Sequence, residues 1–244
     1  MSRDLVTFCA ALLLAGAAGA VARPSGGAQR HRASGRAPAP DGCVRLGSQT
    51  KIVTFGAGRG DVLHAAILGH GSTGVVLSNQ SDRDLCSWLP FAHSLTQAGY
   101  RVLLFDYGNA EPWLEVAAAA RTLHRLGSTH VALIGASEGA KASIIAAARP
   151  GTAANSVVSL SAERYLRGTD VKPWAAKLRR PILFLMAKQD PFTISDTLTL
   201  YRACGSQSKK LVTVAGDAHG VDLLAGASGA DVRENILAFL RRHT

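Results

Sequence analysis

The sequence lacks the patterns that mark several large classes of protein. Its four cysteines and eight histidines are not spaced like the ligands of a zinc site. Lysine and arginine form no dense cluster interleaved with aromatic residues, which make up only 6% of the chain, and this argues against nucleic-acid binding. Asp61 stands where a dinucleotide fingerprint beginning at Gly56 needs its third glycine, and Lys141 follows no glycine, unlike the lysine of a phosphate loop. We therefore expect no metal and no organic cofactor.

Acidic residues are scarce relative to basic ones. The chain has 17 acids against 27 lysines and arginines, a net charge of +10 at pH 7. Part of this excess lies in residues 23–42, which are rich in glycine, serine, alanine and proline and carry no apolar periodicity. This composition predicts a flexible basic tail. The charge favours a weak attraction to anionic surfaces, such as those of a cell envelope.

The N-terminus has the features of a secretory signal peptide. Residues 5–21 are apolar and mostly small and follow Arg3, and both 18–20 and 20–22 fit the small-x-small cleavage pattern. The apolar run is short for a membrane span, which needs about 20 residues. We therefore predict that residues 1–22 are a cleaved signal peptide and that the protein is secreted or extracytoplasmic. An uncleaved anchor is the alternative.

Cysteine use agrees with export. Cys9 would leave with the signal peptide, so Cys43, Cys86 and Cys204 would remain in an oxidising compartment that permits a disulfide. We favour a Cys43–Cys86 pair, because it would tie the start of the folded region to the loop after a central strand. Sequence alone leaves the connectivity open. Cys204 would then be a free thiol, half-buried at the end of a helix.

Residues 43–244 show no second break in composition and no internal repeat, which predicts a single domain. Alternating segments at 51–55 and 62–68 flank a glycine-rich turn and predict an antiparallel hairpin. Continuous apolar runs typical of strands buried on both faces then alternate with helical segments. The strands are expected at 74–78, 101–105, 130–134, 157–160, 181–185 and 211–214, and the helices at 88–98, 112–126, 138–148, 172–178, 195–203 and 230–242. The pattern predicts an α/β fold with a doubly wound, mostly parallel sheet.

A candidate nucleophile lies between one of these strands and the helix after it. Residues 135–139 read Gly-Ala-Ser-Glu-Gly, and the strand–turn–helix setting is that of a nucleophile elbow, where only small residues fit beside the serine. Ser137 would project at the carboxyl edge of the sheet, where the helix N-terminus favours developing negative charge. The alternative is a glycine-rich turn with a bystander serine.

A serine nucleophile needs a base, and the base needs an acid to orient it. His219 follows the strand at 211–214 and leaves at the same edge of the sheet, although a surface histidine is the alternative. Asp190 follows the strand at 181–185 and lies between Ser137 and His219 in the chain, the order expected for this arrangement. Asp196 and Asp217 are rival acids.

The alternation of elements, the pentapeptide and the order Ser137, Asp190, His219 resemble the α/β-hydrolase family, and in particular its small, lidless, dienelactone-hydrolase-like and esterase-like members. The resemblance covers about residues 52–244. It implies an oxyanion hole built from the backbone N–H groups of Ser81 and Glu138, with Gln80 as the alternative to Ser81.

Two residues depart from the pattern of this family. Asn79 and Gln80 replace the His-Gly that usually begins the loop after the third strand. Glu138 would place a carboxylate beside the oxyanion unless its side chain points to solvent. Asp106 matches the aspartate with which the family braces this region.

The resemblance implies a serine hydrolase that cleaves carboxylic esters through an acyl-enzyme. Only about twenty residues separate the strands that end near 160 and begin near 181, too few for a lid domain. An open site suits a small-molecule or polymer-end ester, and we expect a monomer. A thioesterase or amidase with the same triad is one alternative. A catalytically inactive binding protein attached to the cell envelope is the other.

Overall fold

The structure is a computed structural model that describes residues 42–45, 49–58 and 60–244. The predicted signal peptide (residues 1–22) and all but the last residue of the predicted tail (23–42) lie outside this part of the chain. Within the described residues, no helix has both the length and the apolar character needed to cross a membrane.

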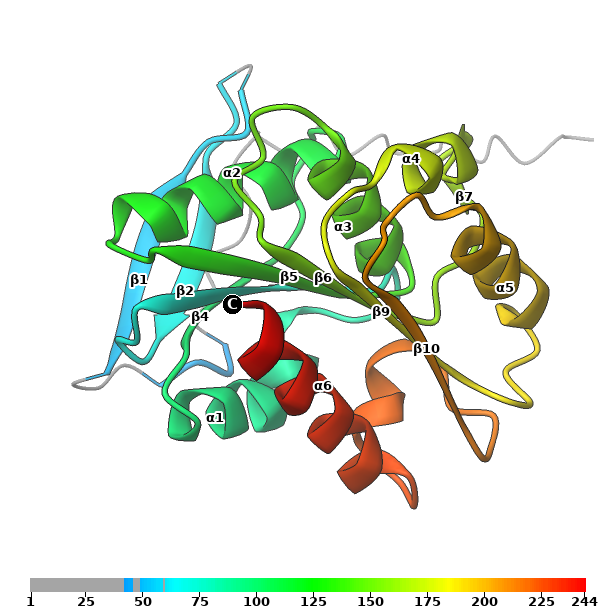
Figure 1. The fold of residues 1–244 in the computed structure, drawn as a ribbon. Coiled ribbons are helices and arrows are strands. Elements are labelled where there is room, and N and C mark those ends of the chain that lie inside the picture. The colour runs from blue at the N-terminus through cyan, green and yellow to red at the C-terminus, as the bar shows by residue number, and fades with distance from the viewer. Residues whose placement is uncertain (1–41, 46–48, 59) are drawn as a thin grey trace, which may run out of the picture. The chain divides into compact units, whose positions relative to one another are not determined.

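An eight-stranded sheet forms the centre of the fold (Figure 1). Its strands lie in the order β1-β2-β4-β3-β5-β6-β9-β10. β2 pairs antiparallel with β1 and β4, and all other neighbours in the sheet are parallel. The strands are β1 (Thr50–Phe55), β2 (Leu63–Leu68), β3 (Thr73–Ser78), β4 (Arg101–Phe105), β5 (His130–Ala136), β6 (Ser156–Leu160), β9 (Ile182–Ala187) and β10 (Lys209–Val214). The predicted mostly parallel sheet with an N-terminal antiparallel hairpin is confirmed.

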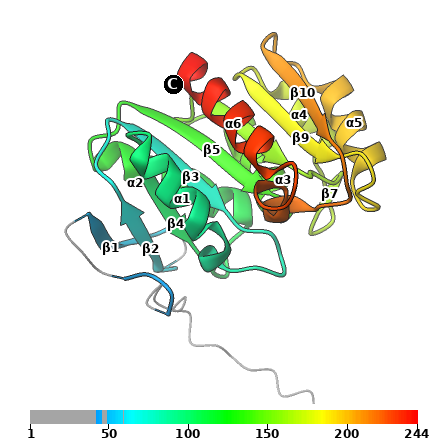
Figure 2. The same ribbon diagram turned by 90° about the horizontal axis from the view of Figure 1, so that it is seen from below.

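Helices cover both faces of the sheet (Figures 1 and 2). One face carries α2 (Pro112–Arg125), α3 (Glu138–Ala148), α4 (Lys172–Lys177) and α5 (Ile194–Ala203), and the other carries α1 (Leu89–Gln97) and α6 (Gly229–His243). Successive residues of β5 alternate between the two cores, with Val131 and Leu133 in one and Ala132 and Ile134 in the other. Burial on both faces explains why the strands read as continuous apolar runs.

Some local features differ from the sequence-based expectation. The helix expected at 88–98 is a 3-10 turn, η1 (Leu85–Trp88), followed by α1, whose first turn contains a proline. A short antiparallel hairpin of β7 (Tyr165–Leu166) and β8 (Thr169–Asp170) was not predicted, because two-residue strands show no periodicity. Helix α5 begins one residue earlier than expected.

A disulfide joins Cys43 to Cys86, with 5.9 Å between their Cα atoms. It links the start of the described chain to η1, which follows β3. Cys204 is a free thiol that follows the last residue of α5 and is buried rather than half-buried.

A buried glutamate of α2 braces the loop after β4. The two carboxylate oxygens of Glu115 accept hydrogen bonds from the N–H groups of Gly108 and Ala110, each at 2.9 Å. Burial disfavours the charged form more than these bonds favour it, so the pKa of Glu115 rises from its ordinary 4.5 to about 7.

This raised pKa predicts a loss of stability as pH rises. Between pH 4.5 and about 7, the folded protein still holds a proton on Glu115 that the unfolded chain has already released. The stabilisation is complete below that window, and up to about 3 kcal/mol is lost above it. Urea unfolding from pH 4 to 8 should therefore show a weaker decline in Glu115→Gln than in the wild type, with the exposed Glu111→Gln as matched control. Equal pH slopes in all three proteins would contradict the prediction.

Candidate active site

Ser137 lies at a sharp turn between β5 and α3. Its backbone adopts φ 46° and ψ −104°, a strained combination for a residue other than glycine. A Cβ atom on Gly135 would lie 2.1 Å from the carbonyl oxygen of Gly139, and one on Gly139 would lie 2.1 Å from that of Ser78. Both glycines are therefore required by close backbone approaches. The geometry is that of a nucleophile elbow at the carboxyl edge of the sheet.

Asp190 and His219 are joined by a hydrogen bond, with 2.9 Å between Oδ2 and Nδ1. The Asp190 side chain is fully buried, and it also accepts bonds from the Thr193 hydroxyl at 2.7 Å and the Phe192 N–H at 3.0 Å. Burial alone would raise the pKa of Asp190, but the three hydrogen bonds together outweigh burial and lower it. Asp190 is thus held as an anion facing the imidazole.

The loop that carries His219 is packed against the serine elbow and the end of β3. The next residue, Gly220, has φ 58°, and a Cβ there would lie 3.4 Å from the Cβ of Ala136 and 2.1 Å from Gln80 Oε1. The same Gln80 oxygen accepts the N–H of Val221 at 2.8 Å. The described hydrogen bonds include none between Ser137 and His219. Such bonds are often long in a free enzyme and shorten when substrate binds.

The rival carboxylates lie elsewhere. Asp196 accepts the backbone N–H of Arg164 at 2.9 Å and thereby braces the segment before β7. Asp217 is exposed and makes no hydrogen bond or ion pair with another described residue. Of the three acids considered from the sequence, Asp190 alone is hydrogen-bonded to His219 among the described residues.

The expected oxyanion-hole donors lie on the two segments that meet at the elbow. Glu138 is the first residue of α3, and its N–H has no intrahelical acceptor. The N–H groups of Gln80 and Ser81 take part in no hydrogen bond among the described residues. Gln80 is buried and Ser81 is exposed, so both stay candidates for the second donor.

The side chains around these donors include one residue that the sequence did not point to. Glu138 Oε1 accepts a hydrogen bond from Nε of Arg167 at 2.9 Å, so its side chain does not point freely to solvent. Arg167 lies at the turn between β7 and β8, which the sequence did not reveal. Asp106 accepts bonds from the Asn79 amide and the Leu85 N–H, both at 2.7 Å, and so fixes the loop after β3.

A cavity of about 580 Å³ opens beside the proposed donors. Its lining residues include Asn79, Gln80, Ser81, Tyr107, Glu138 and Arg167. The described residues contain no group of three histidine, cysteine or acidic side chains able to hold a metal ion.

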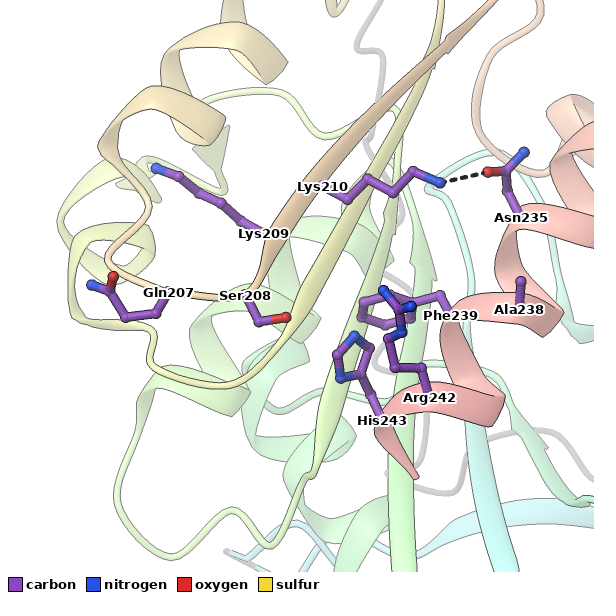
Figure 3. Close-up of a pocket in the computed structure, with 9 residues that line it drawn as sticks. All are labelled: Gln207, Ser208, Lys209, Lys210, Asn235, Ala238, Phe239, Arg242 and His243. Carbon is purple, nitrogen blue, oxygen red and sulfur yellow. Dashed lines mark hydrogen bonds between the residues drawn. The ribbon is translucent and has the colours of Figure 1, made fainter.

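Another cavity, of about 520 Å³, lies between the edge strand β10 and α6 (Figure 3). It is lined by basic and neutral residues without an acid, and Lys210 Nζ donates to Asn235 Oδ1 at 2.9 Å. Lys209 instead bonds the carbonyl groups of Tyr201 and Cys204 at the end of α5. Lysines on an edge strand discourage pairing with other chains. Neither of these two cavities is lined by Ser137, Asp190 or His219, but the first is lined by the proposed oxyanion donors.

Comparisons with known proteins bear on the fold. No family model and no curated protein matches the sequence. Among solved structures, an esterase from Pyrococcus furiosus is similar, with a TM-score of 0.72 and 16% identity over 80% of this chain and 91% of that one. The esterase domain of a Rhodothermus marinus protein gives 0.66 and 22%, covering 80% and 99%. Dienelactone hydrolase from Anabaena variabilis gives 0.69 and 18%, covering 80% and 98%. The chain therefore has the α/β-hydrolase fold.

Proposed function

We propose that this protein is a serine hydrolase that cleaves carboxylic esters, with Ser137 as nucleophile, His219 as general base and Asp190 as the acid that orients it. One observation carries the proposal. A buried aspartate holds the imidazole of His219 at 2.9 Å, on a loop packed against the residue that precedes a serine in an elbow conformation. A serine is activated by a base that takes its proton, and the base is oriented by an acid.

The proposed reaction has two steps. Ser137 Oγ attacks the ester carbonyl while His219 Nε2 takes its proton, and Asp190 stabilises the imidazolium through Nδ1. The N–H of Glu138 and that of Ser81 or Gln80 stabilise the oxyanion. The imidazolium then protonates the leaving alcohol, and a water molecule activated by His219 hydrolyses the acyl-enzyme.

We propose a small or polymer-end ester as the substrate. The cavity lined by Glu138 and the other proposed oxyanion donors has largely polar side chains, and residues 161–180 form only a short hairpin and α4. Esters are favoured over thioesters and amides because two of the structural neighbours above are described as esterases. The same triad could cleave all three kinds of substrate. Secretion, proposed from residues 1–22, is compatible with the Cys43–Cys86 disulfide.

Labelling with a fluorophosphonate tests the proposal. The native protein should form an adduct that mass mapping assigns to Ser137, because the probe reacts only with a serine activated by a base. Heat-denatured protein and Ser137→Ala should not react, whereas Ser81→Ala, which keeps the backbone N–H, should. A folded wild-type protein that takes no label would overturn the proposal and favour the alternative of an inactive binding protein.

A further inference from the structure

The carboxylate of Glu138 lies where a hydrolase would gain nothing from negative charge. Glu138 directly follows Ser137, and its side chain is only 11% exposed. Its own N–H is a proposed oxyanion donor, at the N-terminus of α3. An unpaired carboxylate there would offset the favourable potential of the helix N-terminus and repel the oxyanion.

Arg167 supplies the opposite charge. Its Nε donates to Glu138 Oε1 at 2.9 Å, a charge-assisted bond from an element 29 residues further along the chain. Arg167 has φ 45° and Gly168 has φ 84°, so the tight turn between β7 and β8 holds a non-glycine residue in the left-handed region. Backbone strain of this kind persists where the surrounding structure enforces it, often at functional sites.

The hairpin that carries Arg167 is held from both ends. Arg164, just before β7, donates to both carboxylate oxygens of Asp170 in β8, at 3.2 and 2.8 Å. The N–H of Arg164 is bonded to Asp196 of α5, and the Arg164 carbonyl accepts the N–H of Val171. The turn is therefore anchored to the body of the domain, and the guanidinium is directed at one carboxylate.

We propose that Arg167 is a positioning residue that neutralises and holds Glu138, so that the adjacent N–H can stabilise an oxyanion. This inference rests on the proposed hydrolase function. Arg167 acts through Glu138: its side chain is 47% exposed, whereas that of Glu138, which directly follows Ser137, is 11% exposed. Removing Arg167 should consequently slow the reaction only while the carboxylate of Glu138 is present.

A double-substitution cycle tests this inference, with fluorophosphonate labelling of Ser137 and hydrolysis of p-nitrophenyl acetate as the two readouts. Arg167→Ala should lower the labelling rate and kcat by about 10- to 100-fold, with KM changed less than twofold, because the carboxylate is then unopposed. Glu138→Gln should raise both rates about two- to fivefold. The double variant restores local neutrality and should return to within about threefold of the wild type.

Arg167→Lys, which keeps the charge, should retain most of the wild-type rate. Arg149→Ala is the matched control, since Arg149 follows the other end of α3 and lies over the Trp174 ring. Thermal melts establish that each variant is folded. A double variant as slow as Arg167→Ala would show a merely structural role for the hairpin and overturn the inference, as would wild-type rates in Arg167→Ala. A wild-type protein that takes no label would instead overturn the hydrolase proposal itself.

Discussion

Replacing Asp190 with asparagine is expected to lower kcat for p-nitrophenyl esters by about 10,000-fold while the protein stays folded. In the native structure Oδ1 accepts the Phe192 N–H, and Oδ2 receives the Thr193 hydroxyl and faces His219 Nδ1. An asparagine must keep its oxygen toward the Phe192 N–H, because an amide NH₂ cannot accept that bond. Its NH₂ then takes the place of Oδ2 and donates to Nδ1.

That exchange changes the tautomer of the imidazole. With Nδ1 acting as an acceptor, the ring proton moves to Nε2, and Nε2 can no longer accept the proton of Ser137. The serine then loses its base although every heavy atom keeps its place. The effect should appear in kcat and in the rate of fluorophosphonate labelling, with little change in the melting temperature.

Asp217→Asn is the matched control. Asp217 is exposed, lies two residues before His219, and is an acid that the sequence offers as a rival to Asp190. It should retain wild-type rates. A large loss in Asp217→Asn together with an active Asp190→Asn would move the role of the acid to Asp217. Similar rates in all three proteins would argue against a triad.

The arrangement of strand ends could be foreseen because parallel strands place their carboxyl ends at one edge of a sheet. The apolar runs located β5, β9 and β10, and the residues after them, Ser137, Asp190 and His219, follow from that topology. The helix bounds were also close to those observed, with α3 matching residue for residue. Regular periodicity and chain order carry this information.

The interactions between loops could not be foreseen, because no periodic pattern encodes them. The hydrogen bond that the N–H of Val221 donates to Gln80 Oε1 joins residues 141 positions apart. The pairing of Glu138 with Arg167 depends on a hairpin whose strands have only two residues each. The composition around Arg167 contains one usable signal, since Arg167-Gly168 between Leu166 and Thr169 suits a tight turn, although arginine is unusual there.

Replacing Gly139 with alanine is expected to destabilise the fold by about 3 kcal/mol or more, and to lower the melting temperature by roughly 10 °C. An added Cβ would lie 2.1 Å from the carbonyl oxygen of Ser78 and 2.8 Å from that of Asn79, both backbone atoms that cannot rotate away. Alanine favours a helix over glycine by about 1 kcal/mol, so the clash must overcome an opposing gain.

Gly42→Ala provides the control for this last substitution, because no atom lies within 4 Å of a Cβ built on Gly42. Urea unfolding and thermal melts should show a near-native Gly42→Ala and a weakened Gly139→Ala. The clash separates α3 from the end of β3, and therefore the N–H of Glu138 from those of Gln80 and Ser81. The folded fraction of Gly139→Ala should accordingly label more slowly at Ser137 than the wild type. Unchanged stability would mean that α3 and β3 do not approach each other this closely, and the proposed oxyanion hole would lose its geometric basis.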